Sequence, residues 1–486
     1  MSRVARGWVV SAGLAAGLVV ALLVLALGRG GAAPAATTAA PDFARDVAPI
    51  VRETCLGCHR DGGIAPFAFR TERDLANRAA LVVAALEGRR MPPWPPSAAS
   101  PQYVGEAAHT LDARERTTLV DWARAQLVRP GAARRGTPVG PPPAPPTAPR
   151  RGESLLELAM PTSYRPAAAK GSTDDYRCFL LDPKLTRDAF VTSARIVPGD
   201  AAIVHHVILY RIPEASVSRA TALDGDARGP GWTCFGGPGV GGGTSGSPRG
   251  ILDDAGWIAA WAPGFGAGRL RAGTGIELPA GSRIVMQVHY NLLNGSSPDR
   301  SRAVLTTVPA ATRPIPVQTM LVAAPVELGC RRGEAGQLCD RTAAIFDQVD
   351  RFGAAAALIP TGLLLLCGKD AAHPVASDVS TCGRSFSGPV TIQGVGGHMH
   401  LLGRSIRVDL NPGTPRAQLL LEIPSWSFHW QAVYQLAQPV EAGPGDVVRV
   451  TCRYDTSLRR GVPRYVLWGE GSTDEMCLGI LQVTPR

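Results

Sequence analysis

The stretch HHVILYRI, residues 205–212, is rich in β-branched and aromatic side chains and has the length of a β-strand. Comparable runs recur between Gly- and Pro-containing turns: AFVTSARIV (189–197), SRIVMQVHYNLL (282–293), PVTIQGV (389–395), SIRVDL (405–410), AQLLLEI (417–423) and DVVRVTCRY (446–454). Short strands at such spacing are typical of antiparallel β-sandwiches. The 55 Gly and 42 Pro among 486 residues also argue against long helical bundles. The sequence therefore predicts a mainly β fold.

Several of these runs carry side chains that could bind a redox metal. With the phrase GEGSTDEMC they supply six potential copper ligands: His205, His206, His289, His398, His400 and Met476. Imidazole suits Cu(II) and a thioether suits Cu(I), so the set fits copper better than zinc. Alternation along a strand puts His398 and His400 on one face and directs Met399 toward the core. His205 and His206 are adjacent, so their joint use as ligands requires a twist or bulge.

Four motifs in this order give the chain a family resemblance. HHVILY, QVHYNLL, the HMH triplet and GEGSTDEMC resemble the copper type II, ascorbate-dependent monooxygenases, the family of peptidylglycine alpha-hydroxylating and dopamine beta-monooxygenases, over residues 158–486. The resemblance implies two jelly-roll-like domains with two copper ions that are not bridged. It implies an electron-transfer copper on His205, His206 and His289. It implies an oxygen-binding copper on His398, His400 and Met476.

The departures from that family concern its substrate site. Peptide-amidating members have an Arg at the position of Gly396, where it would hold a substrate carboxylate, and an Asn and a Tyr where this chain has Leu478 and Ile480. We therefore expect the oxygen chemistry without the peptide substrate, and favour a more apolar or uncharged one. Gln287 matches a family Gln and could hydrogen-bond a ligand from the second layer around the metal. A polar residue on a half-exposed strand is the alternative for Gln287.

The motif CLGCH, residues 55–59, predicts covalent attachment of a c-type haem. Cys55 and Cys58 would form the thioethers and His59 would be the proximal iron ligand. Helix-like sequences at 46–55 and 115–127 flank the segment as the terminal helices of a small cytochrome c would. Residues 42–130 thus resemble the cytochrome c family, a small all-α domain.

The sixth iron ligand should lie between these helices. Met91 is the Met of that segment, and Met ligation would raise the haem potential. His109 is the rival for the same position.

Residues 8–27 form an uncharged apolar run long enough to span a bilayer. We expect an uncleaved transmembrane anchor, with Arg3 and Arg6 keeping the N-terminus in the cytoplasm. A signal peptide cleaved near residues 33–35 is the alternative. In either case the remainder is exported, and we expect it in the periplasm at the inner membrane. The expected organisation is an anchor at 1–30, a tether at 31–41, a haem domain at 42–130, a Pro-rich linker at 131–157, and two copper domains at 158–312 and 313–486.

Cysteine usage agrees with export. Ten Cys minus the two haem-binding residues leaves eight, which could form up to four disulfides. The family resemblance favours Cys452 with Cys477. The short separations from 330 to 339 and from 367 to 382 suggest two further pairs.

Other features carry less information. The formal charge of +10 is spread over Arg-rich loops without interleaved aromatic residues, which argues against nucleic-acid binding. SWSFHWQAVYQL, residues 425–436, is interpreted as a core strand, with a lining for an apolar substrate as the alternative. The Gly-rich segment 235–250 lacks the Lys-Ser/Thr of a phosphate loop. We assign no role to His373.

Together these features predict a haem and copper enzyme that hydroxylates a C–H bond of a small substrate with O2. Its two electrons would arrive singly from a cytochrome, a quinol-linked donor or an ascorbate-like reductant. The haem domain would pass them to the copper of His205, His206 and His289. A non-oxygenating electron-transfer protein and a copper-storage or sensing module are the alternatives.

Overall fold

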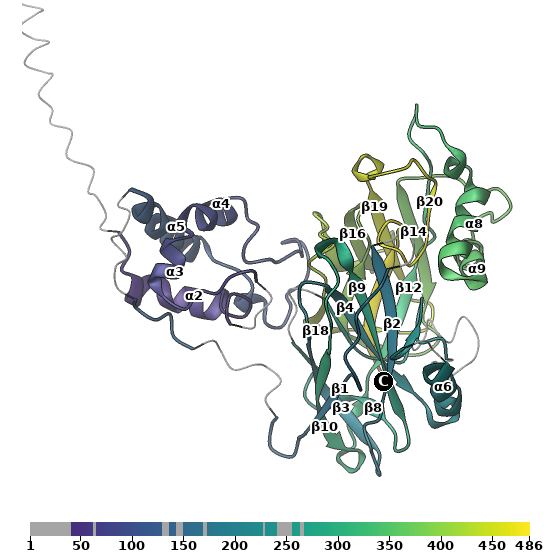
Figure 1. Cartoon of the computed structure of the whole chain (residues 1–486), viewed down its shortest axis with the longest axis horizontal. Coiled ribbons are helices and arrows are strands. Elements are labelled where there is room, and N and C mark those ends of the chain that lie inside the picture. The colour runs from purple at the N-terminus through teal and green to yellow at the C-terminus, as the bar shows by residue number, and fades with distance from the viewer. Residues whose placement is uncertain are drawn as a thin grey trace, which may run out of the picture.

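A computed structural model of the chain describes residues 40–61, 65–128, 136–141, 149–168, 173–226, 229–240, 255–262 and 267–486. The fold is mainly β, as predicted, with a small helical part at its N-terminal end (Figure 1). The expected anchor at 8–27 and residues 241–250 of the Gly-rich segment lie outside the described residues. Among the residues described, no helix is both long and apolar enough to cross a membrane.

The helical part surrounds a small core of its own. Its elements are η1 (Phe43–Val47), α2 (Ala48–Thr54), α3 (Glu72–Ala76), α4 (Ala79–Glu87), η2 (Glu106–Ala108) and α5 (Ala113–Val128). α2 and α5 are the two flanking helices that the sequence predicted. Trp122 of α5 is almost fully buried and packs against the ring of Phe43, with 5.4 Å between ring centroids. Burial of these rings joins the first and last helices of the unit.

The first two sheets pack face to face around a shared apolar core. One sheet has the order β5-β2-β9-β4-β6, and the other has the order β1-β10-β3-β8-β11 with β7 paired to β3. β9 is buried along nearly its whole length, as expected of a central strand. The strands are β1 (Ser154–Ala159), β2 (Asp174–Leu181), β3 (Ala189–Val197), β4 (Val204–Ile212), β5 (Trp232–Thr233), β6 (Trp257–Trp261), β7 (Ala267–Arg269), β8 (Thr274–Leu278), β9 (Arg283–Asn291), β10 (Arg302–Pro309) and β11 (Ile315–Pro316).

A second pair of sheets follows in the chain. Their orders are β12-β21-β15-β18 and β14-β19-β16-β17, with β13 and β20 forming a separate two-stranded ribbon. Alternating burial along β19 directs one face into the shared core. The strands are β12 (Gln318–Ala323), β13 (Glu327–Leu328), β14 (Val379–Ser385), β15 (Val390–His398), β16 (Gly403–Leu410), β17 (Gln418–Ile423), β18 (Val433–Ala442), β19 (Val447–Tyr454), β20 (Val466–Leu467) and β21 (Leu478–Pro485).

Three regions differ from the sequence-based expectation. Helices α6 (Glu214–Asp226), α8 (Arg341–Phe352) and α9 (Leu358–Leu366) lie among the predicted strands, and Figure 1 shows α8 and α9 beside the second pair of sheets. The interpretation of residues 425–436 as a core strand is wrong for its first part, because β18 begins only at Val433. His429 is exposed rather than a satisfied core residue. Phe428 of this segment is buried and stacks on His205, outside any strand.

Eight cysteines form four disulfides. The predicted Cys452–Cys477 pair is confirmed, and it ties β19 to the start of β21. The suggested Cys330–Cys339 and Cys367–Cys382 pairs are also present, and Cys178 pairs with Cys234. Four disulfides indicate a protein of an oxidising compartment, outside the reducing cytosol. Cys55 and Cys58 remain free thiols.

The helical part contacts the second pair of sheets through residues 97–104, which we call the docking segment. Val104 N donates to Gln435 O at 2.8 Å, and Ala437 N donates to Gln102 O at 2.9 Å, so the segment pairs with the edge strand β18. Tyr103 is 5% exposed within the core of those sheets, and its hydroxyl donates to Leu420 O at 2.7 Å. The helical unit is therefore held against β18 (Figure 1).

Replacing Tyr103 should loosen this contact. Tyr103→Ala removes a buried ring and should lower the free energy of unfolding by about 3 kcal/mol. Limited proteolysis should then cut between the helical unit and the sheets faster than in the wild type. Tyr103→Phe, which loses the hydroxyl and keeps the ring, is the control and should show a smaller effect. Equal proteolysis of Tyr103→Ala and wild type would contradict the docking role.

Candidate metal centre

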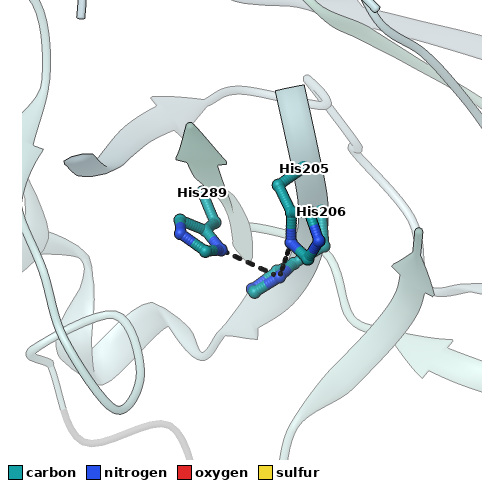
Figure 2. Close-up of side chains that lie close together, drawn as sticks. All are labelled: His205, His206 and His289. Atoms are coloured by element: carbon teal, nitrogen blue, oxygen red, sulfur yellow. Dashed lines mark hydrogen bonds between the residues drawn. The ribbon is translucent and has the colours of Figure 1, made fainter. Parts of the chain in front are cut away.

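The structure brings His205, His206 and His289 together. Their candidate ligand atoms all lie within 4.8 Å of one another. The Nδ1 atom of His206 lies 3.4 Å from Nδ1 of His205 and 3.2 Å from Nδ1 of His289 (Figure 2). The expected bulge is present, because the register of β4 on β9 shifts between Val204 and His206. The extra residue lets both adjacent imidazoles approach the same point.

A buried carboxylate orients His289. The Nε2 atom of His289 lies 2.9 Å from Oδ1 of Asp174, which is at the start of β2. An ionised carboxylate only accepts hydrogen bonds, so Nε2 carries the proton and Nδ1 keeps its lone pair for a metal. Ser472 Oγ also donates to Asp174 at 3.0 Å. Although burial opposes it, the hydrogen bonds from His289 and Ser472 lower the pKa of Asp174 to about 2.

The environment keeps the other two imidazoles neutral. Burial, with a smaller contribution from neighbouring imidazoles, lowers the pKa of His205 to about 2 and that of His206 well below its usual value. Nε2 of His205 is buried and finds no hydrogen-bond partner among the described residues. The ring of Tyr176 stacks on His289 with 4.1 Å between centroids. Three convergent imidazoles are a donor set that a copper ion fits.

His398 and His400 form a second pair at the end of β15. Their rings are nearly perpendicular, with 5.0 Å between centroids. Nδ1 of His398 lies 2.6 Å from Gln431 Oε1, and Nδ1 of His400 lies 3.2 Å from the backbone oxygen of Asp474. Both partners are oxygen acceptors, so both Nδ1 atoms carry protons and both Nε2 atoms remain available to a metal. Burial lowers the pKa values of His398 and His400 to about 4 and about 3.

Met476 is linked to this pair through Glu475. The buried Glu475 carboxylate accepts backbone N–H groups from His400 at 3.0 Å, Leu402 at 2.5 Å and Met476 at 3.2 Å. Burial raises the pKa of Glu475 to about 8, although these three donors oppose the shift. Met476 itself is 8% exposed, and Tyr454 donates to its backbone oxygen. A single side chain thus fixes the strand end and the Met-bearing loop together.

The two ligand sets adjoin each other. The rings of His206 and His398 have centroids 6.4 Å apart. Phe428 stacks on His205 at 4.2 Å and lies 5.9 Å from His400, so it contacts both sets. The absence of a bridge between the two metals stays a prediction.

Residues 469–476, which we call the bridging loop, contact both sets. Ser472 bonds to Asp174 beside the first set, and the backbone oxygen of Asp474 bonds to His400 of the second. Arg351 of α8 forms a two-pronged ion pair with the Asp474 carboxylate at 2.8 and 2.7 Å. The unpredicted helix α8 therefore supports the loop.

Sequence reasoning missed Asp174, Ser472, Glu475, Gln431 and Phe428. The acidic residue beside Met476 was visible in GEGSTDEMC, whereas Asp174 lies far from any His in sequence. Gln287 does not bond a ligand in the described structure. Its amide instead contacts Tyr210, Cys234 and Gly237.

The CLGCH motif lies at the end of α2. Nδ1 of His59 contacts the backbone oxygen of Phe67 at 3.1 Å, which leaves Nε2 for an iron. With Cys55 and Cys58 unpaired, these residues fit a covalently attached haem. Met91 is half-buried, and His109 stacks on Trp94 with 5.8 Å between centroids.

Comparison with known proteins gives two informative matches. Residues 379–482 match the family model of the copper type II ascorbate-dependent monooxygenase C-terminal domain. A segment of 88 residues is 34% identical to tyramine beta-hydroxylase of Caenorhabditis briggsae, covering 18% of this chain and 14% of that protein. Both support a relationship to copper type II monooxygenases, and the relative's match is confined to a small part of its length.

Solved structures add little. A Paenibacillus xanthan lyase is 12% identical with a TM-score of 0.15, and the match covers 70% of this chain and 27% of the lyase chain. The coconut allergen cocosin is 10% identical with a TM-score of 0.13, and the match covers 68% of this chain and 86% of the cocosin chain. Similarities this small carry no argument about fold or function.

Asp174→Asn should weaken copper binding at the first set by about 10- to 100-fold, because His289 loses the partner that fixes its tautomer. Competition with a Cu(I)-specific chelator measures the affinity. Asp175→Asn is the matched control, since Asp175 is the next residue on β2 and bonds instead to Tyr164 and Ala167. Equal affinities for both variants would show that Asp174 does not orient the ligand.

Proposed function

We propose that the protein is a copper-dependent monooxygenase that hydroxylates a C–H bond of a small substrate with O2. The observation that carries the proposal is the convergence of three imidazoles at His205, His206 and His289 beside a second imidazole pair. The family match over residues 379–482 covers the second pair.

The two sets take different roles in this proposal. His205, His206 and His289 hold an electron-transfer copper, and His398, His400 and Met476 hold the copper that binds oxygen. Bound copper would supply one-electron redox chemistry and dioxygen activation at these positions. Asp174 keeps His289 in one tautomer and Gln431 does the same for His398, so these two ligands need little rearrangement on binding.

The space around Gly396 favours a substrate without a carboxylate. A Cβ atom at Gly396 would lie 2.7 Å from the backbone oxygen of Ala432, so a larger side chain would require a backbone shift. Phe428 presents a ring between the two ligand sets. The Phe428 ring and the lack of a side chain at Gly396 favour a small, uncharged substrate.

The proposal includes a haem c on Cys55 and Cys58, with His59 as proximal ligand and Met91 as sixth ligand. The haem domain would relay single electrons from a cytochrome, quinol-linked or ascorbate-like donor to the copper centre. Residues 8–27 would anchor the exported protein to the inner membrane on its periplasmic side.

Met476→Leu should reduce Cu(I) affinity at the second set and abolish substrate-dependent O2 uptake, while the first set keeps its copper. Copper content per chain and oxygen-electrode traces measure both effects. Met320→Leu is the control, because Met320 is also buried in the core of the second sheets and the exchange nearly conserves volume. A wild type that binds copper but takes up no O2 with any of a panel of apolar substrates would favour the copper-carrier alternatives, and a wild type that binds no copper would overturn the copper assignment itself.

Met91→Ala should leave the haem attached, because the two thioethers do not depend on the sixth ligand. The visible spectrum should lose the features of His/Met coordination and the reduction potential should fall. An unchanged spectrum would assign the sixth position to His109 or another residue.

A further inference from the structure

Four aromatic side chains meet where the helical unit contacts the second pair of sheets. Trp94 stacks on His109 at 5.8 Å and meets Tyr434 edge-on at 5.3 Å between centroids. Tyr103 lies 5.1 Å from Tyr434 and 6.1 Å from Trp94. Three of the rings come from the segment between α4 and α5, and Tyr434 comes from β18. We call these four residues the aromatic junction.

On the helical side, the junction is connected to both candidates for the sixth iron ligand. Met91 precedes Trp94 by three residues in the sequence MPPW. His109, the rival candidate, stacks directly on the Trp94 ring. Trp94 is therefore three residues from one candidate ligand and in ring contact with the other.

On the β side, the junction continues toward His398. Tyr434 pairs with Val395 of β15, which ends at His398. Gln431, three residues before Tyr434, accepts the hydrogen bond from His398 Nδ1 at 2.6 Å. A path thus leads from the Trp94–Tyr434 contact along residues 431–434 and through the Gln431–His398 hydrogen bond to a proposed ligand of the second set.

The docking segment also contacts the second pair of sheets, which carries His398. Its hydrogen bonds to the sheets end on β17 and β18, both in the second pair. The sequence-based expectation placed electron delivery at His205, His206 and His289, which are on β4 and β9 of the first pair.

We propose that electrons pass from the helical unit to the copper centre through Trp94 and Tyr434 and arrive at the His398, His400 and Met476 set. This inference rests on the proposed function. In each transfer a ferrous haem becomes ferric and one Cu(II) becomes Cu(I), with no bond made or broken. An external one-electron donor then reduces the haem again.

The test follows internal electron transfer in the intact protein without substrate or O2. Pulse radiolysis reduces the haem of the fully oxidised protein within microseconds, and haem absorbance then reports its reoxidation by copper. Because this reoxidation is intramolecular, its rate should not depend on protein concentration. Trp94→Leu should slow it by roughly an order of magnitude. Trp94→Phe keeps an aromatic ring at the contact and should recover most of the rate. An unchanged rate in Trp94→Leu would overturn the route.

A pair of ligand variants identifies the receiving site. His206→Ala removes a ligand of the first set and should retain the fast phase, whereas His398→Ala should lose it. Loss of the fast phase in His206→Ala and its retention in His398→Ala would overturn the inference and restore delivery at the first set. Electron paramagnetic resonance of the remaining Cu(II) checks which site each variant has emptied.

Failure of the underlying function gives a different result. A wild type without the absorbance of covalent haem, or without bound copper, overturns the proposed function and this route with it. A protein that carries haem and copper but shows the same rate in every variant contradicts the route alone.

Discussion

The hydrogen bonds on the Asp174 carboxylate determine how the two ligand sets meet. Asp174 accepts Nε2–H of His289 from one side and the Ser472 hydroxyl from the other. A buried carboxylate without these donors would be costly, so both partners are held in place. One acidic residue therefore fixes the tautomer of His289 and attaches the loop that carries Met476.

Glu475, which belongs to the bridging loop itself, acts in a comparable way. It accepts three backbone N–H groups and ties His400 to Met476. The ion pair between Arg351 and Asp474 supports the same loop from α8. The fold thus holds the proposed ligands of each set in place through buried hydrogen bonds, which would reduce the cost of binding the proposed copper ions.

Local patterns in the sequence predicted those features that depend on neighbouring residues. The adjacent His205 and His206 required a bulge, and the register of β4 contains one. The Cys452–Cys477 pair followed from the family resemblance and is present. Partners distant in sequence could not be found this way, because Asp174 and Ser472 are 298 residues apart and neither belongs to a recognisable spacing. Helix α8 was likewise missed among predominantly β-forming segments.

The aromatic turn before β18 shows a further limit. Composition alone favoured a strand for residues 425–436, whereas Phe428 instead packs on His205, a contact made only in the folded chain. Periodicity describes how a segment meets its neighbours along the sequence and does not reveal a contact between two sandwiches.

Diffraction from crystals of the copper-loaded protein, recorded on both sides of the copper absorption edge, tests the central claim most directly. The account predicts two anomalous peaks per chain. One should lie among the Nδ1 atoms of His205, His206 and His289, and the other should lie at Nε2 of His398 and His400 with the Met476 sulfur as a third ligand. A single peak, or copper bound away from these imidazoles, would contradict it.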